Sequence, residues 1–541
     1  MVFAFVLPTT SPLSFQSFIY SSTHPSLPQS ASTARHALRL TLKAHKRLPR
    51  GPRQDAHLLT VLSALNDYLP YLFAISHGLS GRPVRSDAST SLGTDVHTET
   101  VPRFGEEVEI TLRAEIESAW RPTLSAGGAL NLGTGFNAPG AKGTRTRNGR
   151  VAGQGIDFEI AFTLTTLGYV LSRLARAGVV ESLYAATTPT AEQRIAALQT
   201  ATRHLLQASA VHGLLASSPA FAATTTSSVP DLNASAQSAL SSLALAEATL
   251  LAVLKDDAYV AACIQTRNPN DRDWMVRAPE IPKVRALLFA RLCVRAAEYA
   301  EQAAAGLGSV GPGAGRAGRV DDDVVRYTGV LGRVARARAC RFFGVDAELA
   351  GKVGEGIAWL QAARTPLGMR SGPGSSSTPA AEESGTGNLS KGGLSRLKRE
   401  WAERREERRI GKDAGGSRSE KGPLEPGDDA GRDEEGRVIA MLETKWVRMN
   451  DTINTQLVPP SAPLLSNLPS GRDIHVPPAP YKPPSLDEDQ LASMRAPPDE
   501  NDDMRFGSDP DDSDEDAAPS DAPGPPGGFP DRSQTASSVY Y

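Results

Sequence analysis

The run of residues from Ala236 to Lys255 contains no Gly or Pro and consists largely of Ala and Leu. Residues of this kind favour the α-helix, so the run predicts one long helix. Apolar side chains fall on opposite sides of that helix at helical spacing. They are Leu240, Leu243, Leu250 and Leu254 on one side and Leu245, Ala248 and Ala252 on the other. Little of this helix is suited to face water, so we expect it to lie at the centre of the fold.

Glu247 interrupts this apolar pattern because it shares the stripe of Leu243 and Leu250. A carboxylate that is buried among leucines needs a hydrogen-bonding partner. We therefore expect Glu247 to be either satisfied by a partner or exposed at the edge of the stripe.

The composition indicates one large folded body with disordered segments attached to it. The 541 residues include 48 Gly and 40 Pro, and only 6% are aromatic, so a good part of the chain cannot join a core. The net charge of −3 argues against a chain-wide attraction to nucleic acid or anionic lipid, and any charge-driven contact must be local. The cysteines Cys263, Cys293 and Cys340 stand singly, which fits a reducing, intracellular setting.

Helical periodicity dominates the first two thirds of the chain. The predicted helices cover residues 31–45, 55–75, 106–118, 157–177, 191–216, 236–255, 284–305 and 322–364. The extended start, Val2 to Leu7, predicts a short strand, and the Gly/Thr-rich residues 125–155 predict a surface loop. This pattern favours a mainly α fold, with antiparallel helix pairs stacked as a solenoid and a small N-terminal β element.

The remaining chain divides by composition. A Gly/Ser/Pro-rich linker begins near Thr365 and includes a charged helix at residues 394–410. A helix returns at residues 438–446 and leads into an extended arm at residues 450–484, whose apolar residues we expect to pin it to the body. Four regions result: a helical domain (1–364), a disordered insert (365–436), a return helix and arm that complete the domain (437–485), and a disordered acidic tail (486–541).

Catalytic and metal-binding patterns do not emerge. His204 and His212 lie two helical turns apart with no carboxylate between them, which favours ordinary surface histidines over a metal site. The Gly-rich segment 133–142 lacks the Gly-Lys step, the preceding strand and the following helix of a phosphate-binding loop. We therefore expect a non-enzymatic protein without cofactor or metal.

Several motifs, taken in their order, resemble the Bro-one domain family, the boomerang-shaped helical domains of ALIX-type endosomal sorting proteins. They are Phe5–Thr10 as the opening strand, Ile156–Leu164 with its Phe-Glu pair, Leu243–Ala248 at the place of a Leu-Ala-Gln-Ala-Gln-Glu signature, Val353–Ala362, and Asn450–Pro459 as the return arm. The sequence is most similar to the fungal branch of this family that acts in ambient-pH signalling. Glu247–Leu250 departs from the usual Gln-Ala-Gln-Glu, so polar contacts made there in relatives do not transfer intact.

The resemblance implies a scaffold that binds the C-terminal helix of the main ESCRT-III filament subunit and supports proteolytic activation of a transcription factor at alkaline pH. It also implies a cytoplasmic protein that is recruited by partners to endosomes or to foci at the plasma membrane. The contact candidates on the central helix are Leu240, Leu243, Glu247, Leu250 and Leu251. A groove between helices suits such a partner because it can accept apolar side chains at helical spacing.

Pro460, Ser461, Ala462 and Pro463 are similar to the short peptides bound by the ubiquitin-variant domain of ESCRT-I. A segment packed against the body is the favoured interpretation, and an ESCRT-I contact is the alternative. For the whole chain three classes stay open: an ESCRT-linked signalling adaptor, a general endosomal-sorting scaffold without a role in pH signalling, and a cryptic enzyme.

Overall fold

The computed structural model describes residues 2–84, 106–125, 145–146, 149–184, 189–221, 224, 229–265, 285–311, 318–369, 427–474 and 479–496. Residues 1–495 form one compact unit, and residues 496–541 form a second. The charged helix expected at residues 394–410 and the acidic tail beyond residue 496 lie outside the described residues.

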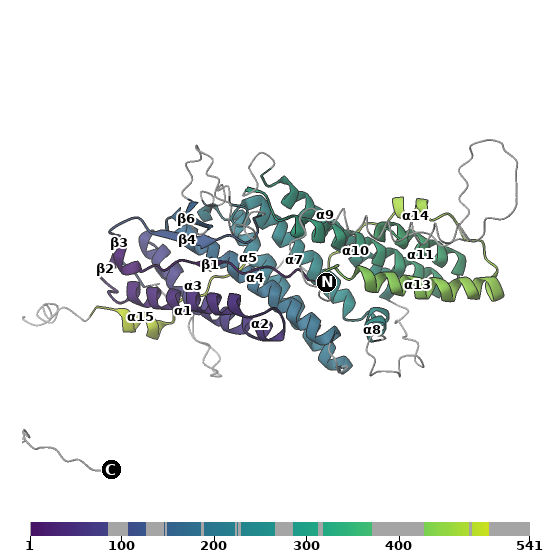
Figure 1. The fold of residues 1–541 in the computed structure, drawn as a ribbon, viewed down its shortest axis with the longest axis horizontal. Coiled ribbons are helices and arrows are strands. Elements are labelled where there is room, and N and C mark those ends of the chain that lie inside the picture. The colour runs from purple at the N-terminus through teal and green to yellow at the C-terminus, as the bar shows by residue number, and fades with distance from the viewer. Residues whose placement is uncertain are drawn as a thin grey trace, which may run out of the picture. The chain divides into compact units, whose positions relative to one another are not determined.

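Long helices make up most of the first unit (Figure 1). They are α1 (Leu27–Arg47), α3 (Leu58–Leu79), α4 (Ile156–Leu183), α5 (Ala191–Ser217), α7 (Ala234–Leu254), α9 (Ala286–Ser309), α10 (Asp322–Leu349), α11 (Val353–Leu367) and α13 (Arg432–Met449), with shorter α2 (Pro52–Ala56) and α8 (Ala258–Gln265). From α4 onward, each long helix packs on the next one: α4 on α5, α5 on α7, α7 on α9, α9 on α10, α10 on α11 and α11 on α13. The predicted helical array is therefore confirmed, with α7 in its middle.

A small antiparallel sheet stands where a helix was predicted at residues 106–118. Strands β1 (Thr9–Thr10), β4 (Glu117–Arg121), β6 (Arg150–Gln154) and β5 (Arg145–Thr146) form it in that order, and β2 (Ile19–Ser21) pairs with β3 (Ile110–Leu112). Ile116, Ser118 and Trp120 are buried and alternate with more exposed neighbours, which is the period of a strand. The predicted helix is wrong. The loop predicted at residues 125–155 is wrong where β5 and β6 lie, and its residues 126–144 and 147–148 lie outside the described residues. The strand expected at Val2 to Leu7 is an extended, unpaired segment, and pairing begins at Thr9.

Glu159 on α4 ties the sheet to the first helices. It is fully buried and accepts hydrogen bonds from Arg35 Nε at 2.9 Å, Tyr68 Oη at 3.0 Å and Trp120 Nε1 at 2.7 Å. Burial would raise the pKa of this carboxyl, but Arg35 and the other donors hold the pKa below its usual range. One charged group thus connects α1, α3, α4 and β4.

Glu435 does the same for the return helix α13. It is fully buried and accepts from Arg338 Nε at 2.9 Å and from Arg341 Nε at 2.5 Å, while Arg341 Nη2 also contacts Asp257 at 2.5 Å. Both arginines lie on α10, and Asp257 precedes α8. The α13 helix, expected at residues 438–446, is longer than predicted because its first turn carries this ion-pair cluster.

The arm that follows α13 contacts the body through only some of the apolar residues that were expected to hold it there. It contains a short π-helix η6 (Asn450–Asn454) and the helix α14 (Ala462–Ser466). Gln456 joins it to the body, since its Oε1 accepts from Gly354 N–H at 3.0 Å and its Nε2 donates to Gly351 O at 2.8 Å. A Cβ at residue 354 would collide with the carbonyl of Leu457, so glycine lets the arm approach α11. Val458, Leu464 and Leu465 pack partly against the core. Ile453 and Leu457 are 75% and 91% exposed, so their side chains do not hold the arm to the body.

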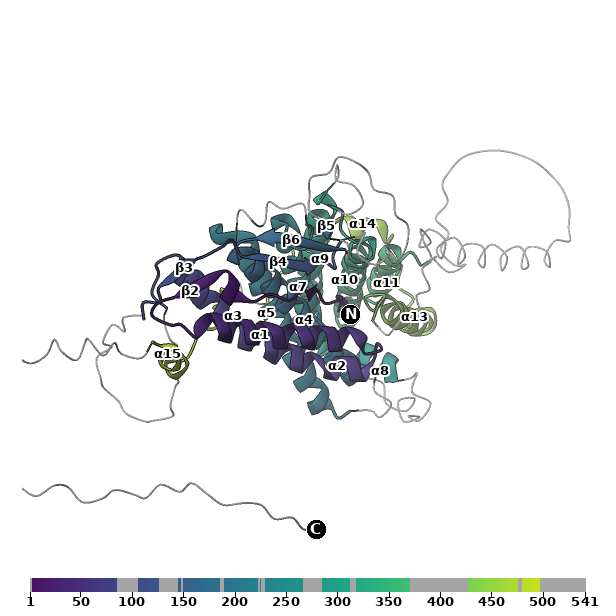
Figure 2. The same ribbon diagram turned by 60° about the vertical axis from the view of Figure 1, so that its left-hand side comes forward.

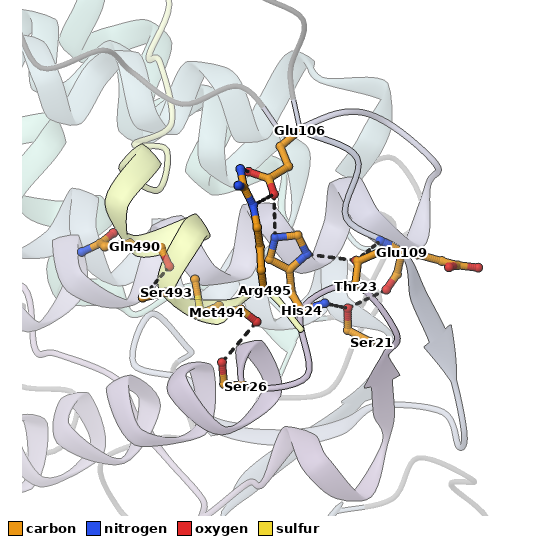
Figure 3. Close-up of polar contacts among 10 residues, drawn as sticks. All are labelled: Ser21, Thr23, His24, Ser26, Glu106, Glu109, Gln490, Ser493, Met494 and Arg495. Atoms are coloured by element: carbon orange, nitrogen blue, oxygen red, sulfur yellow. Dashed lines mark hydrogen bonds and ion pairs between the residues drawn. The ribbon is translucent and has the colours of Figure 1, made fainter. Parts of the chain in front are cut away.

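The body extends past the predicted start of the tail at residue 486. Helix α15 (Glu488–Met494) lies beside the beginning of α1 in both views (Figures 1 and 2), and Leu486, Leu491 and Met494 are buried. Figure 3 shows its polar contacts: Ser26 Oγ donates to Met494 O at 3.3 Å, and Arg495 forms an ion pair with Glu106, which also contacts His24 Nε2 at 3.0 Å. Three apolar anchors and these contacts attach α15 to the body.

Candidate partner-binding site at the central helix

Helix α7 begins at Asn233, whose side-chain oxygen accepts from Ser235 N–H at 3.0 Å and so caps the helix. The five contact candidates on this helix are all buried, at most 5% exposed: Leu240, Leu243, Glu247, Leu250 and Leu251. They belong to the core between α5 and α9. A partner helix cannot touch them without displacing those neighbours, so the prediction that they form a contact surface does not fit their burial. Periodicity identified an apolar face but not what covers it.

Glu247 is satisfied and buried, which confirms the first of its two expected environments. Its Oε1 accepts from Phe3 N–H at 2.9 Å and from Tyr327 Oη at 2.9 Å. Burial raises the pKa of this carboxyl to about 7, and the two hydrogen bonds only partly oppose the rise. Arg176 lies close by and donates to Val2 O at 2.8 Å and to Asp428 at 2.7 Å. The extended N-terminal segment is therefore held against α7 through Glu247 and against α4 through Arg176.

The accessible side of α7 is small and polar. A shallow groove of about 400 Å³ runs between the first half of α7 and the last half of α9. Its lining consists of Ala234, Ser235, Ser238, Ala239, Ser242, Gln302, Gly306 and Ser309. Ser235 and Ser238 are exposed. A Cβ at Gly306 would lie 2.9 Å from the Cβ of Ala239, so glycine allows α9 to approach α7 closely at the groove floor.

A buried polar network supports the other side of the same half of α7. Gln237 Oε1 lies 2.7 Å from His212 Nδ1 on α5, and Gln237 Nε2 donates to Thr165 Oγ1 on α4 at 3.0 Å and to the carbonyl of Asp231. Burial lowers the pKa of His212 to about 4 and raises the pKa of Asp231 to about 6. His212 is thus a core residue, and its predicted surface position is wrong. These contacts fix the groove-forming half of α7 against its neighbours.

Reactive groups are not gathered at this groove. The three cysteines are buried, and burial raises the pKa of each thiol, to about 11 for Cys263 and about 12 for Cys293 and Cys340. Within the described part of the chain, no cluster of three or more His, Cys, Asp or Glu side chains has the arrangement of a metal site. What the groove offers is a rigid, uncharged concavity on a helix pair.

The four residues compared with ESCRT-I ligands lie on the arm. Pro460, Ala462 and Pro463 are exposed and Ser461 is half-buried. Ala462 and Pro463 open α14, so this segment is not extended throughout, contrary to expectation. An extended docking mode would first require α14 to unwind.

No family model matches the chain. The chain is 59% identical over 538 residues to the pH-response regulator protein palC of Emericella nidulans, an alignment that covers 99% of this chain and 100% of that protein. Among solved structures, it is similar to a chain of the ALIX BRO1 CHMP4C complex, with a TM-score of 0.49 and 15% identity over 90% of this chain and 98% of that one. A structure described as the basis for endosomal targeting by the Bro1 domain gives a TM-score of 0.41 and 12% identity, covering 91% and 95% of the two chains. Since both scores are below 0.5, the assignment to a family rests on the Emericella relative.

Proposed function

Because this chain belongs to the family of the pH-response regulator palC, we propose that it is a non-enzymatic adaptor in the fungal response to alkaline pH. The observation that carries the proposal is the 59% identity over nearly the whole of both proteins. The alignment covers nearly the whole chain, including α7, α10, α13 and the return arm, so the same body is expected to serve the same pathway. In this role the adaptor supports proteolytic activation of a transcription factor.

The partner we propose is the C-terminal helix of the main ESCRT-III filament subunit. The Bro-one motifs favour it, and the groove between α7 and α9 is a concavity between two helices, lined by small residues, against which a helical ligand can pack. Its small side chains leave room for large apolar residues of a partner, which would bury surface that Ser235 and Ser238 leave open. The buried leucines of α7 then act indirectly, by keeping the groove rigid.

Filling the groove tests this assignment. We expect Ser238→Trp to lower the affinity for a fluorescent peptide of the ESCRT-III C-terminal helix by at least tenfold, because an indole would occupy the groove. Ser217→Trp, at the exposed end of α5, is the matched control and should bind as the unaltered protein does. Equal affinity of all three proteins would remove the groove as the binding site, whereas no binding by any of them would count against the partner itself.

The location we propose is the cytoplasm, with recruitment to endosomes or to foci at the plasma membrane. An ESCRT-I contact through Pro460 to Pro463 is a separate proposal, supported by the exposure of three of the four residues. A peptide of residues 455–468 can be compared with the intact protein by titration against the ESCRT-I domain. Binding by both would establish the contact, binding by the peptide alone would show that α14 masks it, and binding by neither would end the proposal.

A further inference from the structure

The charges of the chain are strongly segregated near its N-terminal end. Residues 1–54 contain seven Arg and Lys and no Asp or Glu, and residues 118–156 contain five Arg and Lys and again no Asp or Glu. The overall charge of −3 conceals this local excess. The fold brings the two acid-free segments together, since α1 packs against β1, and β1 pairs with β4.

Six cations of these segments form what we call the basic face. They are Arg39, Lys43, Lys46 and Arg47 on α1, Arg121 on β4 and Arg150 on β6. Desolvation lowers the pKa of Lys43, and the nearby charges of Arg39, Arg150 and Arg47 lower it further. The pKa of Lys46 is lowered in the same way, by desolvation and then by Arg121 and Arg150. Because α1 packs against β1, β1 pairs with β4 and β4 pairs with β6, the cations of α1 and those of the sheet lie close enough for their charges to repel one another.

Carboxylates do not compensate the part of this face that lies on α1. Among the described residues, Arg39, Lys43, Lys46 and Arg47 form no ion pair, whereas Arg35 on the inner side of the same helix is buried against Glu159. The helix thus separates a structural arginine, which faces inward, from cations that face outward. Uncompensated like charges oppose folding, so nothing about the fold itself accounts for them.

An exposed apolar side chain lies beside these cations on α1. Leu40 is 51% exposed on α1 and follows Arg39 by one residue and precedes Lys43 by three. A helix with cations and an exposed leucine on its outer side has the character of a helix that lies on a lipid surface, with the apolar group entering the headgroup layer. Clusters of four to eight Lys and Arg on such a helix suit membranes that contain acidic phospholipids.

We propose that the basic face, centred on Lys43, Lys46, Arg47 and Leu40 of α1, binds the surface of a membrane rich in anionic phospholipid. This contact is direct and adds to recruitment by protein partners. It differs from the groove between α7 and α9, so it does not depend on the ESCRT-III assignment. Binding through several weak charge contacts is reversible and sensitive to salt.

Vesicle flotation with the full-length protein tests the proposal. The probes are vesicles of phosphatidylcholine alone and vesicles that also contain about 30% phosphatidylserine, where about 1 kcal/mol per cation corresponds to roughly fivefold in affinity for each charge. We expect binding only to the phosphatidylserine vesicles, loss of that binding at high salt, and an affinity about a hundredfold lower for the triple variant K43Q/K46Q/R47Q. L40S should bind severalfold more weakly.

The matched control removes three exposed cations elsewhere, in R437Q/K445Q/R448Q on α13. This variant has the same net charge as the triple variant of α1 and should bind within about twofold of the unaltered protein, given that charge acts locally at a surface. Equal losses in the two triple variants, or equal binding to vesicles with and without phosphatidylserine, would overturn the proposal. If K43Q/K46Q/R47Q bound vesicles as well as the unaltered protein does but bound poly-uridine RNA more weakly, the proposal would be overturned in favour of a nucleic-acid surface.

Discussion

Two buried carboxylates, Glu435 and Glu247, join distant parts of the chain in opposite ways. Glu435 accepts hydrogen bonds from two arginines of α10, and their positive charges hold its pKa below the usual range despite burial. Glu247 accepts hydrogen bonds from one backbone N–H and one tyrosine hydroxyl, and burial raises its pKa to about 7. Equal depth in the core thus leaves one group ionised and brings the other near its titration midpoint at neutral pH.

The difference shows what each contact can contribute to stability. A buried ion pair contributes little over an apolar pair, yet breaking it is costly because a charge is left unpaired. A carboxyl that has no cation beside it can be buried at low free-energy cost only while it is protonated. We therefore expect α13 to be held firmly at all ordinary pH values, and the N-terminal segment to be held less firmly as the pH rises.

The largest expected effect comes from removing α13 altogether. A chain that ends at Met369 leaves Arg338 and Arg341 without Glu435, and should lose more than about 5 kcal/mol, enough to unfold an ordinary domain. Replacing residues 371–426 by a short Gly/Ser linker should leave stability nearly unchanged. Thermal unfolding followed by circular dichroism compares the two. A truncated chain that melts at the same temperature as the full chain would show that α13 is dispensable.

The second largest loss of stability is expected from removing the Glu435 carboxylate alone. We expect Glu435→Ala to lower the free energy of unfolding by about 3–5 kcal/mol, because Arg338 then stays buried without a carboxylate and Arg341 keeps only Asp257. Glu301→Ala breaks the surface pair with Arg336, whose side chains are 49% and 38% exposed, and should cost at most about 1 kcal/mol. Urea unfolding at pH 7 measures both. Similar losses in the two variants would contradict the role given to the buried cluster.

Glu247 should make the free energy of unfolding depend on pH. Its folded-state pKa of about 7 exceeds its ordinary value of 4.5, so the folded protein binds the proton more tightly than the unfolded chain does. Stability from this group is complete below pH 4.5 and is lost between pH 4.5 and 7, by about 3 kcal/mol in all. Glu247→Gln removes the titration, and its advantage over the unaltered protein should grow from pH 5 to pH 8 in urea unfolding. Parallel stability curves would place the pKa of Glu247 near its ordinary value.

The smallest effect is expected at the arm. Leu457 is 91% exposed, so Leu457→Ser should change the free energy of unfolding by less than about 0.5 kcal/mol. Val458→Ser, at the half-buried neighbour, should cost about 1 kcal/mol or more by loss of apolar contact. If Leu457→Ser were the more costly of the two, the arm would contribute to the body through a contact other than those described.

Sequence periodicity predicted the long helices because Ala and Leu in α7, and the apolar stripes of its neighbours, leave no alternative structure. It failed at residues 106–121 for a specific reason. Val108, Leu112, Ile116 and Trp120 recur every four residues, a spacing compatible with one face of a helix and with one face of a strand. Ile116, Ser118 and Trp120 alternate with more exposed residues in the structure, but the sequence does not show this alternation because Ser118 is polar.

The candidate site was only partly accessible to sequence reasoning. Glu247 stood out as a charge among leucines, but its partners Phe3 and Tyr327 are 244 and 80 residues away, and no local pattern joins them. The groove was missed because serine and alanine give no periodic signal. The leucines of α7 predict a contact surface instead, since an apolar stripe looks the same whether a core or a partner covers it.

Because α15 docks on the start of α1, the N-terminal part of the fold is completed only late in synthesis. Ser26 and Met494 are separated by 468 residues, so the first long helix leaves the ribosome tens of seconds before the helix that completes its surroundings. Leu486, Leu491 and Met494 reach their places only when nearly the whole body has been synthesised. Until then, the surface at the start of α1 that they cover is open to solvent and to chaperones. Release of a nascent chain before Leu486 would leave the start of α1 without the three apolar residues that cover it.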